Sequence, residues 1–382
     1  MNIVYAKEKL PNSTVGSIFL AGPTPRNNSV ESWRPEALRQ LEVLGYRGDV
    51  FVPEPRDGIY SADYVAQVEW ELAALERADV IVFWVPREMT HMPALTTNVE
   101  FGLWIDSGKA ILGFPATAEK MRYLEHHVKS RNDKVYTTLD DTLKAALNTV
   151  GKGSRRIGGE CDVPLHIWRT DTFQLWYTDL KLAGNRLDGA RVVWTFPTSS
   201  SKPPFFWALK VNVWINSESR SKDIEVVISR PHICAAVMYK SKENILDTEV
   251  VLVREFRSAV SNAEGYVWEL PGGSDPLDSS ASTKVVAKEI HEETGLVISE
   301  ERLQMTGSRQ QMSTLTSTKA TLYKVELTDM EIKYARSLSG QIFGDAESTE
   351  QTYVEVVTLR EVLQGNLVDW TNTGMLMQVI LG

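Results

Sequence analysis

The stretch Ala78-Asp-Val-Ile-Val-Phe-Trp-Val-Pro86 predicts a buried strand, because all six residues between Asp79 and the closing proline are apolar. It is one of several strand-like runs that alternate with helical patterns between residues 17 and 130. The predicted strands are Ser17–Ala21, Asp49–Pro53, Asp79–Val85 and Lys109–Phe114, and the helical patterns are 35–44, 63–78, 98–107 and a stretch after Ala116. This order predicts a doubly wound α/β domain with a parallel sheet.

A break in this pattern follows at Gly151-Lys-Gly-Ser-Arg-Arg-Ile-Gly-Gly159, which has four glycines and no periodic apolar face. After it the chain becomes rich in strands and turns, with one strong helix before the C-terminus. We therefore expect an N-terminal domain at 1–150, a linker at 151–160 and a mixed-sheet α+β domain at 161–382. A length of 382 residues also favours two domains.

The composition limits the classes of partner. Forty-one Lys and Arg against fifty Asp and Glu give a formal net charge of −9, which disfavours broad nucleic-acid binding. No apolar stretch has the length of a membrane helix, and the first residues lack a signal-peptide core. Cys161 and Cys234 are too few for a disulfide framework, so we expect buried thiols in a cytoplasmic protein.

A set of carboxylates marks the strong helix of the second half. Glu289, Glu292 and Glu293 stand at i, i+3 and i+4 on one helical face, where their repulsion favours a shared cation. Oxygen ligands of this kind suit Mg²⁺ or Mn²⁺, which in turn bind a substrate diphosphate. The alternative is a solvated acidic helix face.

The stretch from Glu269 to Leu296 resembles the box of the Nudix hydrolases, and its flanks resemble the ADP-ribose and nucleotide-sugar pyrophosphatase branch. The resemblance implies metal ligands at Glu289, Glu292 and Glu293, with Glu292 and Glu293 also catalytic, and an opening glycine at Gly273. It further implies metal contact by Glu269, phosphate contact by Arg254 or Arg257, and a general base among Asp345, Glu347 and Glu350, of which we choose Glu347. Lys288 stands where the box has Arg, and the first glutamate of the box is missing.

In the first half, Glu100 follows Thr97 and Asn98, either of which can cap a helix. This places Glu100 in the first helical turn, where the helix dipole favours an ionised carboxylate. Glu71 and Asp79 are candidates for a second carboxylate at the same sheet edge. Paired carboxylates at such an edge suit cleavage of a glycosidic bond. The alternative is a glutamate that only complements the helix dipole.

Three motifs of this half, Ile18-Phe-Leu-Ala-Gly-Pro23, Ala78–Pro86 and Thr97-Asn-Val-Glu-Phe-Gly102, are similar to the nucleoside 2-deoxyribosyltransferase-like family. The resemblance implies that Glu100 is the nucleophile and that Glu71 contacts the nucleobase. It also implies substrate contacts at Gly22, Pro23 and Asn98. The family's usual acidic residue before the nucleophile is absent, so hydrolysis stands beside transfer as the predicted reaction.

Together these patterns predict a bifunctional enzyme that processes a small nucleotide, with N-glycosidic cleavage or transfer in the first domain and Mg²⁺-dependent hydrolysis of a diphosphate-linked nucleoside in the second. One alternative is that only the second domain is catalytic and the first recognises the nucleotide. Another is a nucleotide sensor without turnover. The pyrophosphatase resemblance also predicts a homodimer in which the segment 164–215 exchanges between subunits. We expect no extended nucleic acid or membrane as a partner.

Overall fold

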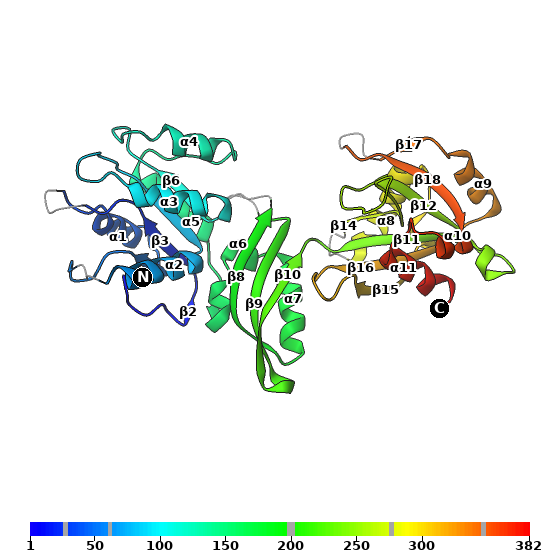
Figure 1. The fold of residues 1–382 in the computed structure, drawn as a ribbon, viewed down its shortest axis with the longest axis horizontal. Coiled ribbons are helices and arrows are strands. Elements are labelled where there is room, and N and C mark those ends of the chain that lie inside the picture. The colour runs from blue at the N-terminus through cyan, green and yellow to red at the C-terminus, as the bar shows by residue number, and fades with distance from the viewer. Residues whose placement is uncertain (26–29, 60–62, 197–202, 275–278, 345–348) are drawn as a thin grey trace. The chain divides into compact units, whose positions relative to one another are not determined.

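The computed structural model describes residues 1–25, 30–59, 63–196, 203–274, 279–344 and 349–382, and it folds as two compact units, Met1–Ser229 and Arg230–Gly382. The division follows Ser229 rather than the segment 151–160 expected from the sequence. The reason is that this segment pairs within the first unit, where β7 (Arg156–Ile157) lies antiparallel to β2 (Ser13–Thr14). Figure 1 shows the elements of both units.

The first unit contains a five-stranded parallel sheet in the order β1-β4-β3-β5-β6. Its strands are β1 (Asn2–Tyr5), β3 (Ser17–Ala21), β4 (Asp49–Val52), β5 (Val80–Trp84) and β6 (Ala110–Gly113). The four strands expected from the sequence are thus confirmed within one residue at each end, and β1 is an additional edge strand. Every residue of β3, β4 and β5 is buried, as expected for a sheet covered on both faces.

Helices cover both faces of this sheet, which confirms the doubly wound α/β arrangement (Figure 1). One apolar core joins the sheet to α2 (Tyr64–Arg77), α3 (Leu95–Trp104) and α4 (Arg122–Lys129) through residues such as Leu75, Phe101 and Leu124. A second core on the opposite face joins it to α1 (Arg34–Val43) and α5 (Leu139–Val150) through Leu41 and Leu143.

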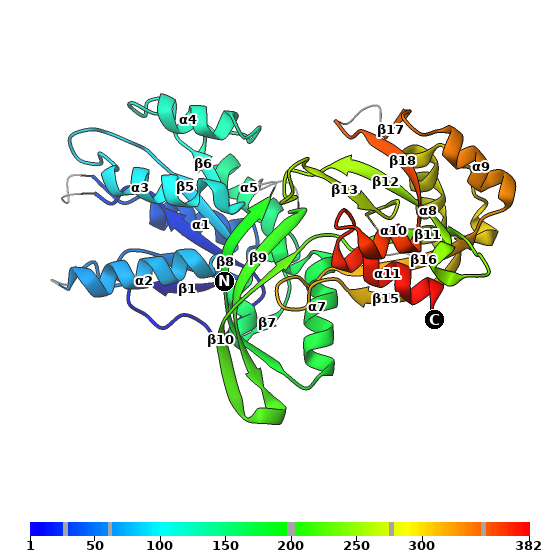
Figure 2. The same cartoon turned by 45° about the vertical axis from the view of Figure 1, so that its right-hand side comes forward.

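The rest of the first unit is a small antiparallel sheet with its own core. It has the order β10-β9-β8, with β8 (Arg186–Phe196), β9 (Phe206–Ile215) and β10 (Arg220–Ser229), preceded by α6 (Leu165–Trp168) and α7 (Asp171–Leu182). Figures 1 and 2 show α7 beside this sheet, and Phe173 and Tyr177 of α7 pack with Trp207 of β9. The sequence did not reveal α7, because its aromatic residues also favour strands.

The second unit is a mixed sheet between two helical layers. Its main path is β15-β16-β11-β12-β18-β17, where β11 and β16 are parallel and the other neighbours antiparallel. The strands are β11 (Ile233–Lys240), β12 (Glu249–Phe256), β13 (Tyr266–Glu269), β14 (Gly272–Ser274), β15 (Gln304–Gln310), β16 (Lys319–Glu326), β17 (Ile342–Phe343) and β18 (Thr352–Thr358).

In the described part of the second unit, the layers are formed by α8 (Ser279–Thr294), α9 (Asp329–Ser337), α10 (Leu359–Gln364) and α11 (Trp370–Ile380). The core under α8 and α9 includes Ile290 and Ile332, and the core under α10 and α11 includes Val362 and Leu376. Helix α8 ends as the sequence predicts, because Gly295 adopts a left-handed φ of 68° directly after it.

The two cysteines and the lengths of the helices bear on two predictions from the sequence. Cys161 and Cys234 are free and buried, which confirms the expected thiols. Within the described ranges, no helix combines the length and apolar character needed to cross a membrane.

Candidate active site

The candidate site of the first unit lies beyond the carboxyl ends of β3 and β4, where the buried Arg34 organises the backbone. Its guanidinium donates hydrogen bonds to the carbonyl oxygens of Leu20 (3.0 Å) and Gly22 (2.7 Å), and it pairs with Glu54 at 2.6 Å. Trp33 donates from Nε1 to the carbonyl oxygen of Pro23 at 3.2 Å. Gly22 and Pro23 therefore form a loop whose carbonyl groups already have internal partners.

Gly22 is required at this position because its φ is 149° and a Cβ there would overlap the carbonyl oxygen of Trp84. The close approach of two strand ends thus depends on this glycine. Sequence reasoning selected Gly22 for substrate contact, and its position at the sheet edge is compatible with that role.

Glu100 and Glu71 lie near each other and near Arg34, although they come from different helices. The pKa of Glu100 is raised to about 7, mainly by burial; the charge of Glu71 also raises it, and the charge of Arg34 opposes this rise. Burial also raises the pKa of Glu71, against a hydrogen bond from Gln67 at 2.7 Å and the charge of Arg34. Among the described residues, none donates a hydrogen bond to the Glu100 carboxyl group, which leaves it available for chemistry.

The expected electrostatic environment of Glu100 was wrong. Helix α3 begins at Leu95 after Ala94, which has a left-handed φ of 54° and makes no side-chain cap. Thr97 and Asn98 therefore lie inside the helix, and Glu100 falls in its second turn, beyond the first-turn N–H groups. Burial and the neighbouring carboxyl group dominate instead, so the pKa of Glu100 is raised rather than lowered.

Asn98 and Glu100 lie on opposite faces of α3, since two residues correspond to about 200° of helical rotation. The amide oxygen of Asn98 accepts a hydrogen bond from Arg87, a buried residue that directly follows Pro86 at the end of β5. The sequence analysis did not single out Arg87, although a charged residue just beyond a parallel strand is a recognisable signal.

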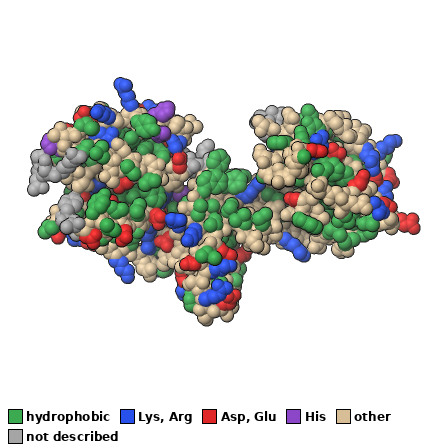
Figure 3. Space-filling model, in the orientation of Figure 1, with side chains coloured by type: hydrophobic (Ala, Val, Ile, Leu, Met, Phe, Trp, Pro, Cys, Tyr) green, Lys and Arg blue, Asp and Glu red, His purple; other side chains and the backbone are tan. Residues whose placement is uncertain are grey.

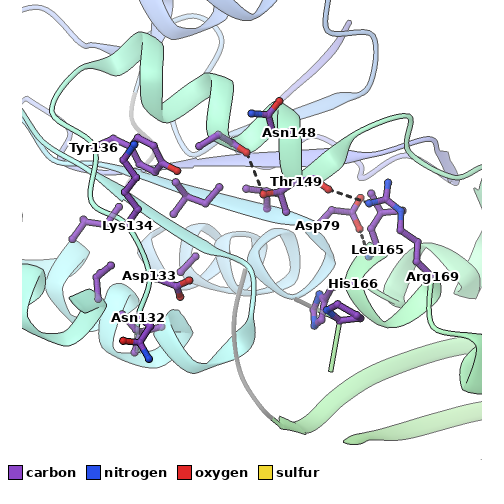
Figure 4. A pocket seen from close by; sticks show the side chains of 18 residues that line it. Asp79, Asn132, Asp133, Lys134, Tyr136, Asn148, Thr149, Leu165, His166 and Arg169 are labelled. Carbon is purple, nitrogen blue, oxygen red and sulfur yellow. Dashed lines mark hydrogen bonds between the residues drawn. The ribbon is translucent and has the colours of Figure 1, made fainter. Parts of the chain in front are cut away.

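Asp79 does not lie at this edge, contrary to the expectation of a second carboxylate there. It precedes β5, so it sits at the amino end of the parallel sheet, where it pairs with the buried Arg156 at 2.5 Å and accepts a hydrogen bond from the Leu165 amide at 2.9 Å. Figure 4 shows Asp79 and Leu165 in the wall of a cavity of about 640 Å³, which neither Glu71 nor Glu100 lines. Asp79 is a structural ion-pair partner.

In the second unit, the described carboxylates form a cluster around α8. The pKa of Glu293 is raised to about 9, mainly by burial; Glu289, Glu350 and Glu255 also raise it, and the Gly272 amide, which donates at 3.0 Å, lowers it. The pKa of Glu255 is raised to about 7, mainly by burial; the charge of Arg257 opposes this rise, and Glu350 and Glu269 add to it. The cluster thus includes Glu255 of β12, which sequence reasoning missed.

Gly273 leaves room for this cluster, because a Cβ on it would overlap the carboxyl group of Glu289. Arg257 is its cation, pairing with Glu255 at 2.8 Å and with Glu269 at 2.9 Å. Glu292 instead pairs with Lys288 at 2.8 Å along the helix. Of the predicted bases, Asp345 and Glu347 lie outside the described residues, while Glu350 is electrostatically coupled to Glu293.

Arg254 lies on the other face of β12, because side chains alternate along a strand and Arg254 precedes Glu255. It pairs with Glu355 at 3.0 Å, between the rings of Tyr266 and Tyr353. Within the described residues, no three acidic, histidine or cysteine side chains converge closely enough to hold a metal ion.

A family model described as nucleoside 2-deoxyribosyltransferase like matches residues 15–118. The match spans β3 to β6 together with Glu71 and Glu100, so this part of the first unit is similar to that family. No curated protein matches the chain.

Proposed function

We propose that the first unit cleaves or transfers the N-glycosidic bond of a nucleoside or nucleotide, with Glu100 as nucleophile. The observation that carries this proposal is the buried carboxyl group of Glu100, whose pKa lies near 7 beside a second carboxyl group with a raised pKa. The family match over residues 15–118 supports the same reaction class.

In this mechanism ionised Glu100 attacks the anomeric carbon and forms a glycosyl ester as the carbon–nitrogen bond breaks. Neutral Glu71 gives its proton to the departing nucleobase, which leaves uncharged. Water, or a second base in the transfer reaction, then attacks the ester, returns Glu100 to its carboxylate form and gives a proton back to Glu71. The raised pKa values allow one group to be ionised while the other is protonated near neutral pH.

For the second unit we propose hydrolysis of a nucleoside diphosphate-linked substrate with Mg²⁺ or Mn²⁺, as in the Nudix hydrolases. The supporting observation is a concentration of negative charge, since Glu289, Glu350 and Glu255 each raise the pKa of the buried Glu293, and Glu255 and Glu269 both pair with Arg257. A divalent cation would relieve this repulsion.

The donor set fits a hard cation in charge and chemistry, with Glu289 and Glu293 as the central ligands. When bound, the metal neutralises charge on the diphosphate. The protein contributes Glu350 or the predicted Glu347 for orienting and deprotonating water, and Arg257 for contact with phosphate. The pairing of Glu292 with Lys288 favours Glu289 over Glu292 as the partner of Glu293.

The two activities are tested together by chromatography with mass detection on nucleosides, nucleoside mono- and diphosphates, nucleotide sugars, ADP-ribose and NAD, with and without Mg²⁺. Glu100→Gln should abolish release of free base, and Glu293→Gln should abolish release of monophosphate. Glu69→Gln on the exposed side of α2 and Glu301→Gln after α8 are matched controls that should retain both. Base release that survives Glu100→Gln contradicts the first proposal, and tight binding without turnover would favour a sensor.

We also propose a homodimer formed through the β8–β10 sheet. Trp194, Phe196 and Phe205 are 50%, 53% and 40% exposed, and Figure 3 shows hydrophobic side chains gathered over this region. Exposed aromatic groups of this kind favour burial against a second surface. Light scattering should give a dimer mass for the native chain and a monomer mass for Trp194→Ser with Phe205→Ser; a native monomer would contradict the proposal.

A further inference from the structure

A separate pocket of about 590 Å³ lies on the face of α3 that is turned away from Glu100. Leu95, Asn98 and Gly102 line it, and their spacing of three and four residues places them on one side of the helix. Its volume falls within the range of small-molecule sites. The glycosidic mechanism proposed above uses none of these groups.

Arg87 is the decisive residue of this pocket, since it is only 5% exposed and yet has no acidic partner among the described residues. It donates from Nη1 to the carbonyl oxygen of Lys120 at 3.2 Å and from Nη2 to the amide oxygen of Asn98. Its buried Nε finds no acceptor in the part of the chain that the structure describes. Both partners are neutral, so the guanidinium charge is uncompensated.

A buried cation without a counterion is unfavourable, and burial accordingly lowers the pKa of Arg87. Asp106, which also lines the pocket, is already paired with Arg131 through two contacts of 2.6 and 2.8 Å. The nearby Glu119 accepts a hydrogen bond from the Met89 amide at 3.4 Å and is not a lining residue. The side chain of Lys120 adds a further positive charge at the wall.

The start of α3 strengthens the case for an anion. This ten-residue helix has no side-chain cap at Ala94, and Pro93 and Leu95 on either side of that position line the pocket. Free N–H groups and the positive end of the helix dipole therefore lie beside the pocket. Guanidinium, ammonium and backbone amide groups are the donors that proteins use to bind phosphate.

Two aromatic side chains also line the pocket. The rings of Tyr123 and His127 lie 4.6 Å apart, centroid to centroid, in an edge-to-face arrangement, and both residues line the pocket. A flat ring on the ligand can pack against them. We propose that this pocket binds a small aromatic phosphate monoester, with its phosphate at Arg87 and Lys120 and its ring at Tyr123 and His127.

Isothermal titration calorimetry on the full chain, with phenyl phosphate, inorganic phosphate and benzoate as probes, tests this proposal. Phenyl phosphate should bind most tightly. Arg87→Met should weaken its binding about tenfold or more, and Lys120→Gln about threefold, because each removes a charged donor. Arg87→Met keeps the length of the side chain, and Lys120→Gln provides a second test if the buried variant does not fold.

Two matched variants locate the site. Arg122→Gln removes an exposed charge that is not part of the pocket, and Glu100→Gln changes the opposite face of α3, so both should bind phenyl phosphate as the native chain does. Unchanged binding by Arg87→Met would overturn the proposal. Benzoate binding as tight as phenyl phosphate would overturn the choice of phosphate, and equal binding of inorganic phosphate would overturn the aromatic part.

Discussion

The two units use buried glutamates in different ways. In the first unit Glu100 and Glu71 face each other with Arg34 nearby, and the pKa of Glu100 lies near 7. In the second unit Glu293 lies among Glu289, Glu255 and Glu350, and its pKa rises to about 9. We proposed proton chemistry for the pair in the first unit and metal binding for the cluster in the second. The difference between the two proposals rests on the number of neighbouring charges rather than on the residue type, since both sites are built from glutamates.

The comparison is tested most severely by removing the nucleophile. We expect Glu100→Gln to reduce base release by more than about 10³-fold, because an amide cannot form the glycosyl ester. Hydrolysis of the diphosphate should remain at the native level, since it belongs to the other unit. The measurement is the initial rate of each product. A parallel loss of both activities would show that the Glu100 site of the first unit and the glutamate cluster of the second unit do not act independently.

The independence of the two folds can be tested at the buried ion pair between Arg156 and Asp79. Arg156→Ala leaves Asp79 without its counterion, so we expect the free energy of unfolding of the first unit to fall by about 3–5 kcal/mol. Hydrogen exchange should show faster exchange in β3 and β5 and unchanged protection in β11 and β12. The control is Arg155→Ala, an exposed neighbour. Equal effects of the two variants would contradict the structural role of this pair.

Mg²⁺ should stabilise the second unit, which holds the glutamate cluster around Glu293, and not the first unit with Glu100 and Glu71. At a Mg²⁺ concentration ten times its Kd, we expect the second unit to gain about 1.4 kcal/mol of stability while the first gains none. Thermal unfolding monitored in each unit measures this, and Glu293→Gln should abolish the gain. Glu292→Gln should retain most of it, because Glu292 already pairs with Lys288. No stabilisation of the native chain would remove the basis for the metal proposal.

The smallest expected effect is a shift in pH dependence. Glu100 acts as nucleophile only when ionised and Glu71 as acid only when protonated, so base release should rise towards about pH 7, where Glu100 loses its proton, and fall at higher pH as Glu71 loses its own. Glu71→Gln removes the proton donor, which slows the reaction, and removes the charge that ionised Glu71 carries, which should move the inflection of Glu100 to lower pH. Rate profiles across pH measure both effects, with Glu69→Gln as control. An unmoved inflection would mean that the two carboxyl groups do not interact.

The sequence by itself determined the local elements and the candidate carboxylates. An apolar run predicted β3 at Ser17–Ala21, because a buried strand needs apolar residues. A glycine after an amphipathic pattern predicted that α8 ends before Gly295, because a left-handed backbone conformation favours glycine. Family motifs selected Glu100 and Glu71, which the fold brings together from two helices.

Only the tertiary structure decided what surrounds these residues. It placed Glu100 in the second turn of α3 and paired Asp79 with Arg156 at the other end of the sheet. It also buried Arg87 where no acid among the described residues pairs with it. It also placed residues 151–229 with the first unit. The burial, pKa and charge balance of a side chain depend on neighbours that are far apart in the sequence. The spacing of residues along the sequence does not show which of them come into contact.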